Sequence, residues 1–168
     1  MINKRLLVLC VILTVLAATL QALPRLLGDA FAFAAVLGGF PIYAAAHLHW
    51  AWGIAVYLAA AYLSSIVNMG EAMFFICSNG IIGLSLGISA NRLKNTYIRP
   101  VPSVLAVIAM LSAVNSLFGI NIFGYSPLRT PLQQVLILFL PLYIYCLIFL
   151  KLAIFADDLL HRHIELDT

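Results

Sequence analysis

Seven polar or charged residues lie in or next to long apolar stretches of the sequence, and they are its best candidates for binding a small molecule. They are Gln21, Asn68, Glu71, Asn79, Asn115, Asn121 and Arg129. Polar side chains inside a membrane cost free energy unless they meet partners or a wet cavity. Because several segments contribute them, the set predicts one polar substrate pocket. Alternatively, each amide makes an interhelical hydrogen bond, which is worth about 0.6 kcal/mol.

Glu71 and Arg129 carry opposite charges, and both are expected at the same end of the molecule. They could form an ion pair, contact a substrate, or remain solvated charges at the membrane surface. The residue types alone leave these three possibilities open.

Two His-x-His pairs, at His47 and His49 and at His161 and His163, are the only candidates for metal ligands. Two such pairs could hold a metal ion. Neither pair has a third ligand close by in the sequence, so we predict no metal and no cofactor. The sequence also lacks a Walker A loop, a Gly-x-Ser-x-Gly motif and a His-Glu-x-x-His motif. The chain is therefore predicted not to be an enzyme.

The composition indicates that lipid must cover much of the protein. Of 168 residues, 64% are hydrophobic and 9% are charged, whereas a soluble domain has about 25% charged residues. Too little polar surface remains for a water-facing exterior. The length fits a single integral membrane domain over residues 1–168. Membrane lipids are therefore the expected partners, and a net charge of +3 is too small and too scattered to suggest nucleic acid.

Six stretches are apolar and long enough for a helix to cross a bilayer, which takes about 20 residues. They are residues 6–23, 30–46, 50–67, 71–90, 101–122 and 132–160. Short connections around residues 47–49 and 68–70 predict tight antiparallel hairpins. The predicted fold class is all-α, a polytopic membrane protein built as a six-transmembrane-helix bundle.

The positions of Lys and Arg predict the orientation of this bundle, because cytoplasmic loops carry an excess of basic residues. With the N-terminus inside, the cytoplasmic side receives Lys4, Arg5, Arg92, Lys94, Arg99, Lys151 and Arg162. The outside receives only Arg25 and Arg129. We therefore predict a multi-pass protein of the plasma or inner membrane with both termini in the cytoplasm. In this orientation the polar pocket opens outward.

Small residues repeat every four positions on two of the predicted helices. Ala18 and Ala22 form one such pair, and Gly83 and Gly87 form another. Small residues let helix backbones approach closely in lipid. The pairs could serve ordinary packing within the chain or contact with a partner protein.

The middle of the sequence resembles a known group of membrane proteins. Gly38-Gly-Phe-Pro-Ile-Tyr43 leads into a short turn and Trp50-x-Trp52-Gly, and Glu71-Ala-Met-Phe-Phe75 precedes Asn79-Gly-Ile-Ile-Gly-Leu-Ser-Leu-Gly87. This pattern resembles the uncharacterised YybS-like membrane proteins. It is more distantly similar to the S components of energy-coupling factor (ECF) transporters. Ala18 and Ala22 match the Ala-x-x-x-Ala with which those S components meet their coupling partner.

The resemblance implies an S-component-like, substrate-binding subunit of a vitamin or other small-molecule importer. Such a subunit would dock onto a transmembrane coupling protein driven by ABC-type ATPases, and the absence of a nucleotide motif here fits that division of labour. The alternative is a non-transporting scaffold for cell-envelope or division machinery, similar in fold to the MreD-type proteins. A channel or exporter subunit is a third possibility. However, the sequence lacks a polar stripe through both halves of the bilayer.

Overall fold

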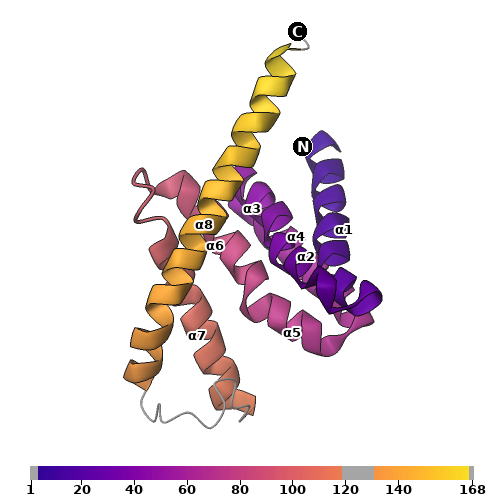
Figure 1. Cartoon of the computed structure of the whole chain (residues 1–168). Helices are drawn as coiled ribbons and strands as arrows, with labels where there is room; N and C mark the ends of the chain where they lie inside the picture. Colours follow the sequence, from indigo (N-terminus) through magenta and orange to yellow (C-terminus); the bar gives the residue numbers. More distant parts are fainter. Residues whose placement is uncertain (1–3, 119–130, 167–168) are drawn as a thin grey trace.

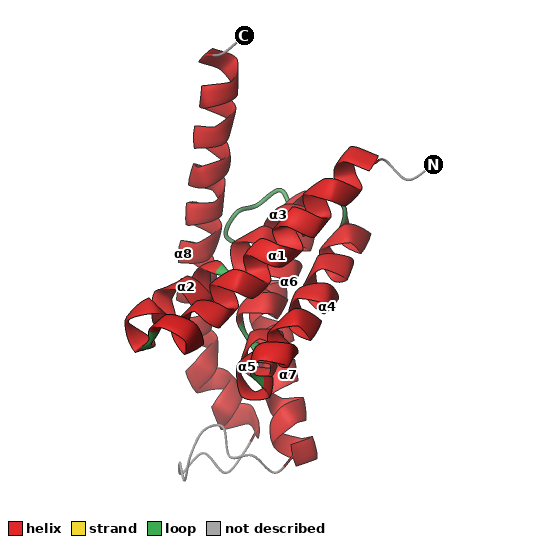
Figure 2. Ribbon diagram, turned by 90° about the vertical axis from the view of Figure 1, so that its right-hand side faces the viewer, coloured by secondary structure: helices red, strands yellow, loops and turns green. Residues whose placement is uncertain are grey.

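The computed structural model describes residues 4–118 and 131–166, and within these ranges the protein is helical with no strand (Figure 2). The elements are α1 (Lys4–Leu27), the 3-10 helix η1 (Asp29–Phe31), α2 (Ala32–Leu37), α3 (Gly39–Leu48), α4 (Trp50–Val67), α5 (Met69–Cys77), α6 (Asn79–Arg92), α7 (Pro100–Phe118) and α8 (Pro131–Leu166). The predicted all-α class is therefore confirmed for the described part of the chain.

Two of the predicted helices are each divided into two pieces. The stretch predicted at residues 30–46 forms α2 and α3, which are interrupted at Gly38. The stretch predicted at residues 71–90 forms α5 and α6, which are interrupted at Ser78. Both interruptions lie inside apolar sequence, so their backbone groups need partners from elsewhere in the protein.

Within residues 4–118 and 131–166, four helical segments are long and apolar enough to cross a membrane. They are Lys4–Leu27, Trp50–Val67, Met69–Arg92 and Val135–Ala156. Ala32–Leu48 and Pro100–Ser116 are shorter apolar helices. Large apolar side chains are exposed on the outside of the bundle, for example Val8, Ile12 and Leu136. These features are consistent with a membrane protein whose exterior is covered by lipid.

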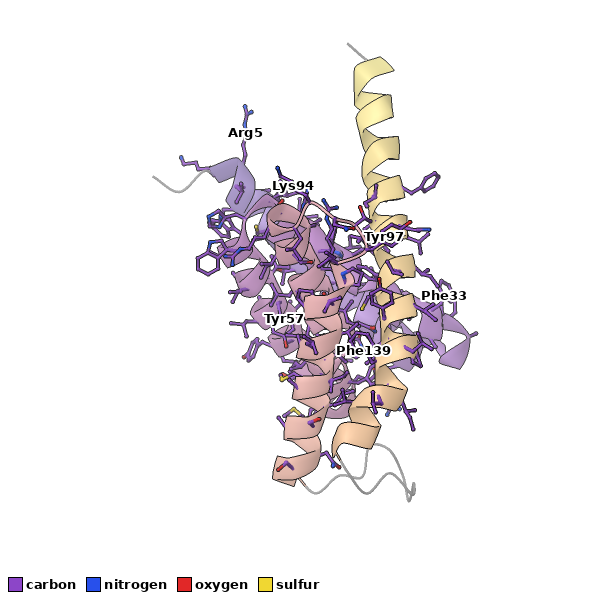
Figure 3. All side chains as sticks on the ribbon, turned by 90° about the vertical axis from the view of Figure 1, so that its left-hand side faces the viewer. Arg5, Phe33, Tyr57, Lys94, Tyr97 and Phe139 are labelled. Atoms are coloured by element: carbon purple, nitrogen blue, oxygen red, sulfur yellow. The ribbon has the colours of Figure 1, made fainter. Side chains whose placement is uncertain are left out.

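The two termini and the connection between α6 and α7 lie toward the same end of the molecule (Figures 1 and 2). Arg5 and Lys94 are both found at this end (Figure 3). The turns at Gly28, between α1 and η1, and at Asn68, between α4 and α5, lie toward the opposite end. Two of the basic residues that the sequence assigns to the cytoplasmic side, Arg5 and Lys94, are therefore close to the same end.

Helix α3 lies at the centre of the bundle and packs against α1, α4 and α6. Glycines make these crossings close. A Cβ atom on Gly83 of α6 would collide with the carbonyl group of Gly39, and one on Gly87 would lie 2.6 Å from the Tyr43 carbonyl oxygen. A Cβ atom on Gly53 of α4 would overlap Ala46. The Gly83 and Gly87 pair thus serves packing within the chain.

Candidate functional site

The interruption at Ser78 leaves backbone carbonyl groups that side chains must satisfy. Ser78 has φ −126° and ψ −96°, outside the helical range, so the regular hydrogen-bond pattern stops there. The Tyr57 hydroxyl of α4 donates to the Ile76 carbonyl oxygen at 3.0 Å, and the Ser78 hydroxyl donates to the Phe74 carbonyl oxygen at 2.5 Å. A non-helical residue within the bundle is tolerated because neighbouring groups supply these bonds.

Asn79, the first residue of α6, connects this break to the one at Gly38. Its Nδ2 donates to the Ala35 carbonyl oxygen at the end of α2, over 3.1 Å. Its Oδ1 accepts a hydrogen bond from the Tyr145 hydroxyl of α8, also over 3.1 Å. Asn79 is 5% exposed. A single buried amide therefore links three separate helices.

A cavity of about 540 Å³ lies beside these two breaks. Its polar lining residues are Gln21, Glu71, Ser78, Asn79 and Tyr145, and the rest of its lining is mainly apolar, including Phe74, Ile82 and Leu142. Sites for small molecules usually have volumes of about 300–1,000 Å³ and a few polar groups in apolar walls. The cavity has the size and the mixture of groups expected for such a site.

Gln21 is the least satisfied of the polar residues in the lining. Its side chain is 2% exposed, and its Oε1 atom is buried with no hydrogen-bond partner in the described part of the chain. A buried acceptor without a donor costs about 1–3 kcal/mol. Because no donor in the described part of the protein satisfies the Gln21 Oε1 atom, we expect a bound ligand to supply the hydrogen bond.

Three of the seven predicted site residues, Gln21, Glu71 and Asn79, meet at this cavity. Asn115 does not: it is half-buried on α7 and does not line the cavity. Asn121 and Arg129 lie outside the described residues, as does any pairing of Arg129 with Glu71. The interpretation of these amides as interhelical ties also holds in part, because Asn79 makes two such bonds.

Asn68 lies beside the cavity as a helix cap and is not part of its lining. Its Oδ1 accepts hydrogen bonds from the backbone N–H groups of Gly70 at 2.8 Å and Glu71 at 3.2 Å. These bonds satisfy donors at the start of α5. The spacing Asn68-x-x-Glu71 is close to that of a capping box, so the sequence carried the signal for this role. The cap fixes the first turn of α5, which positions Glu71.

Tyr145 is the site residue that reasoning from the sequence missed. It stands in the apolar run of α8, where a tyrosine is easily read as core. A buried tyrosine hydroxyl usually finds a partner, and this general rule was the available signal. The partner could not be foreseen, because Asn79 is 66 positions away in the chain.

An aromatic pair joins α3 to α8. The rings of Phe40 and Phe149 stack with their centroids 4.2 Å apart, and Phe149 lies over Gly39, close to the Asn79 carbonyl group. Phe40 also lines a second groove of about 590 Å³ between α1, α3 and α8, and the described residues of this groove are apolar, for example Leu16 and Leu152.

Ala18 and Ala22 lie along α4 rather than on a free face of α1. Ala22 is 8% exposed and Ala18 is half-buried, and both line a groove with Leu63 and Ile66 of α4. α4 therefore covers Ala22, whereas Ala18 remains partly accessible, and contact of this pair with a coupling protein stays a prediction.

The histidines near the turn between α3 and α4 have roles within the protein. His49 Nδ1 accepts a hydrogen bond from the Ala51 backbone N–H at 3.2 Å, and the ring of His47 stacks on Tyr43 with a centroid distance of 5.7 Å. Over the described side chains, no three His, Cys, Asp or Glu residues come together as a metal site would require. The side chains of His161 and His163 lie outside the described part.

Comparisons with known proteins returned no match, whether against family models, curated proteins or solved structures.

Proposed function

We propose that this chain is the substrate-binding membrane subunit of a small-molecule importer and that the cavity beside Ser78 is its binding site. The observation that carries the proposal is the position of the cavity next to two interrupted helices. In membrane transporters, substrate sites are typically formed where membrane helices are discontinuous, near the middle of the bilayer. Here the interruptions at Gly38 and Ser78 both adjoin the cavity, and Gln21 offers it an unsatisfied amide.

The orientation of the cavity follows from the basic residues. With six spans and both termini in the cytoplasm, the end that holds Arg5 and Lys94 faces inward. The start of α5, with Glu71, then faces outward and places the cavity where it captures a solute from outside the cell. The resemblance to S components of ECF transporters supports the same assignment, and with it a transmembrane coupling protein and ABC-type ATPases as partners.

Co-purification in mild detergent tests the importer assignment. The full chain, tagged at its C-terminus and expressed in its own host, should retain an ABC-type ATPase pair. Recovery of cytoskeletal or peptidoglycan-synthesising proteins in place of the ATPases would overturn the proposal in favour of the scaffold.

Native mass spectrometry of the same preparation tests the cavity. A bound small molecule should add mass to the wild type and be lost in Ala35→Trp, which fills the cavity. It should remain in the matched control Ala59→Trp, because Ala59 is exposed on α4 and does not line the cavity. Equal occupancy in both variants would place the ligand elsewhere.

A further inference from the structure

The cavity has a distinctive balance of charge. Among the described residues that line it, Glu71 is the only one with a formal charge, and none of them is basic. Among the described residues, no ion pair neutralises this carboxylate. Apolar walls weaken the screening of a charge, so an unpaired carboxylate there favours a cation strongly and opposes an anion.

The hydroxyl and amide donors of the lining are largely committed within the protein. The Tyr145 hydroxyl donates to Asn79, Asn79 Nδ2 donates to Ala35, and the Ser78 hydroxyl donates to Phe74. A hydroxyl oxygen that has given its only hydrogen still has lone pairs that can accept. The groups that remain for a ligand therefore include three acceptors: the Glu71 carboxylate and the oxygens of the Tyr145 and Ser78 hydroxyl groups.

Gln21 adds a further acceptor. Its Oε1 has no donor in the described part of the chain, and the residue lines the cavity. The terminal torsion of a glutamine side chain is soft. A half-turn of the amide therefore presents this oxygen to a bound N–H group.

We propose that the cavity selects small amines: ligands with an apolar body and one protonated nitrogen, which Glu71 binds by charge and Gln21 by hydrogen bonding. This inference rests on the cavity of the proposed function and names the class of its substrate. The apolar body contacts Phe74, Ile82 and Leu142, and the ammonium group lies at the Glu71 end. Carboxylates are excluded because they would place a second negative charge beside Glu71.

Matched ligands test this selectivity on the purified full-length chain in detergent. The probes are 2-phenylethylamine, 2-phenylethanol and phenylacetate, and the acyclic set hexylamine, hexanol and hexanoate, with Kd taken from thermal-shift titrations. We expect each amine to bind about 10- to 100-fold more tightly than its alcohol, as for a hydrogen bond to a charged group. The acids should bind most weakly.

Glu71→Gln should remove the preference for amines and leave the alcohols unchanged. The variant keeps the shape of the side chain and the backbone N–H that Asn68 caps. Asp157→Asn, on the C-terminal part of α8, is the charge-matched control, because it removes one negative charge and leaves Glu71 in place. If Glu71→Gln fails to fold, the ranking of the matched probes on the wild type still decides the question.

The inference is overturned if no amine stabilises the protein, or if alcohols or acids bind as well as the amines. If these outcomes occur while an ABC-type ATPase co-purifies, the importer assignment stands and only the substrate class fails. If amines bind with Glu71-dependent preference and no ATPase is recovered, the substrate class stands and the importer assignment fails.

Discussion

Gly83 and Gly39 meet so closely at the crossing of α6 and α3 that a Cβ atom on Gly83 would overlap the Gly39 carbonyl group. The contact lies one turn beyond Asn79 on α6, and Gly39 follows the interruption at Gly38. Close approach of these two backbones therefore holds the two broken segments together, and with them the wall of the cavity.

Gly83→Ala should lower the free energy of unfolding by about 1–3 kcal/mol, the usual cost of overpacking. The added methyl group meets backbone, which cannot turn aside as a flexible side chain would. Thermal unfolding of the purified protein in detergent provides the measurement. Ser85→Ala, on the same helix, is the control and should change stability less, since its hydroxyl bonds only within α6. A Gly83→Ala protein as stable as the wild type would contradict the close crossing.

Tyr145→Phe and Asn79→Ala should show coupled effects on stability, because each removes one side of the same hydrogen bond. Interhelical hydrogen bonds in membranes contribute about 0.6 kcal/mol on average and up to about 1.7 kcal/mol. A double-mutant cycle measures this coupling. Tyr143→Phe is the matched control, as its hydroxyl donates to the Tyr97 carbonyl oxygen and not to Asn79. Coupling of Asn79 to Tyr143 as large as to Tyr145 would argue against the observed pairing.

Ala22→Leu and Ala18→Leu should differ in their effects. Ala22 is buried against α4, so leucine there should destabilise the protein by about 1–3 kcal/mol. Ala18 is half-buried beside a groove of about 360 Å³ that can accept the larger side chain. Thermal unfolding compares the two variants. If a coupling protein binds at this groove, Ala18→Leu should also reduce its co-purification without loss of stability. Equal stability of both variants would show that α4 does not cover Ala22.

Single cysteines introduced at Met69 and Lys94 should report opposite sides of the membrane. Both positions are exposed. Met69 begins α5 and Lys94 belongs to the connection between α6 and α7, and the start of α5 and this connection lie toward opposite ends of the bundle. In intact cells a membrane-impermeant maleimide should label Met69→Cys at once and Lys94→Cys only after permeabilisation. The wild type is the background control, because Cys10, Cys77 and Cys146 are buried. The reverse labelling pattern would invert the orientation and turn the cavity toward the cytoplasm.

The helices themselves could be predicted because length and apolarity dominate in a membrane protein, whereas their interruptions could not. Nothing in the local sequence requires Ser78 to leave the helix; the break depends on Tyr57, whose hydroxyl satisfies the freed Ile76 carbonyl group from another helix. Near the interruption at Gly38, Asn79 gives the Ala35 carbonyl oxygen a second hydrogen bond from 44 positions away in the chain. A hydropathy profile cannot show that a side chain distant in the sequence forms a hydrogen bond with a backbone group.

The candidate site was predictable in part for the same reason. Gln21, Glu71 and Asn79 stand out because polar residues are rare in apolar sequence, and they meet at one cavity. The depth of a residue in the membrane could not distinguish these three residues from Asn115. The difference depends on which face of each helix points toward the cavity. Nor could depth show that Asn68 caps α5, although its spacing from Glu71 carried that information.

The stacked rings of Phe40 and Phe149 have a mechanical consequence. They join α3 to α8 with their centroids 4.2 Å apart, and aromatic pairs of this kind contribute about 0.5–1.5 kcal/mol beyond the area that they bury. A motion that slides α8 along α3 must therefore part the two rings and lose this contribution.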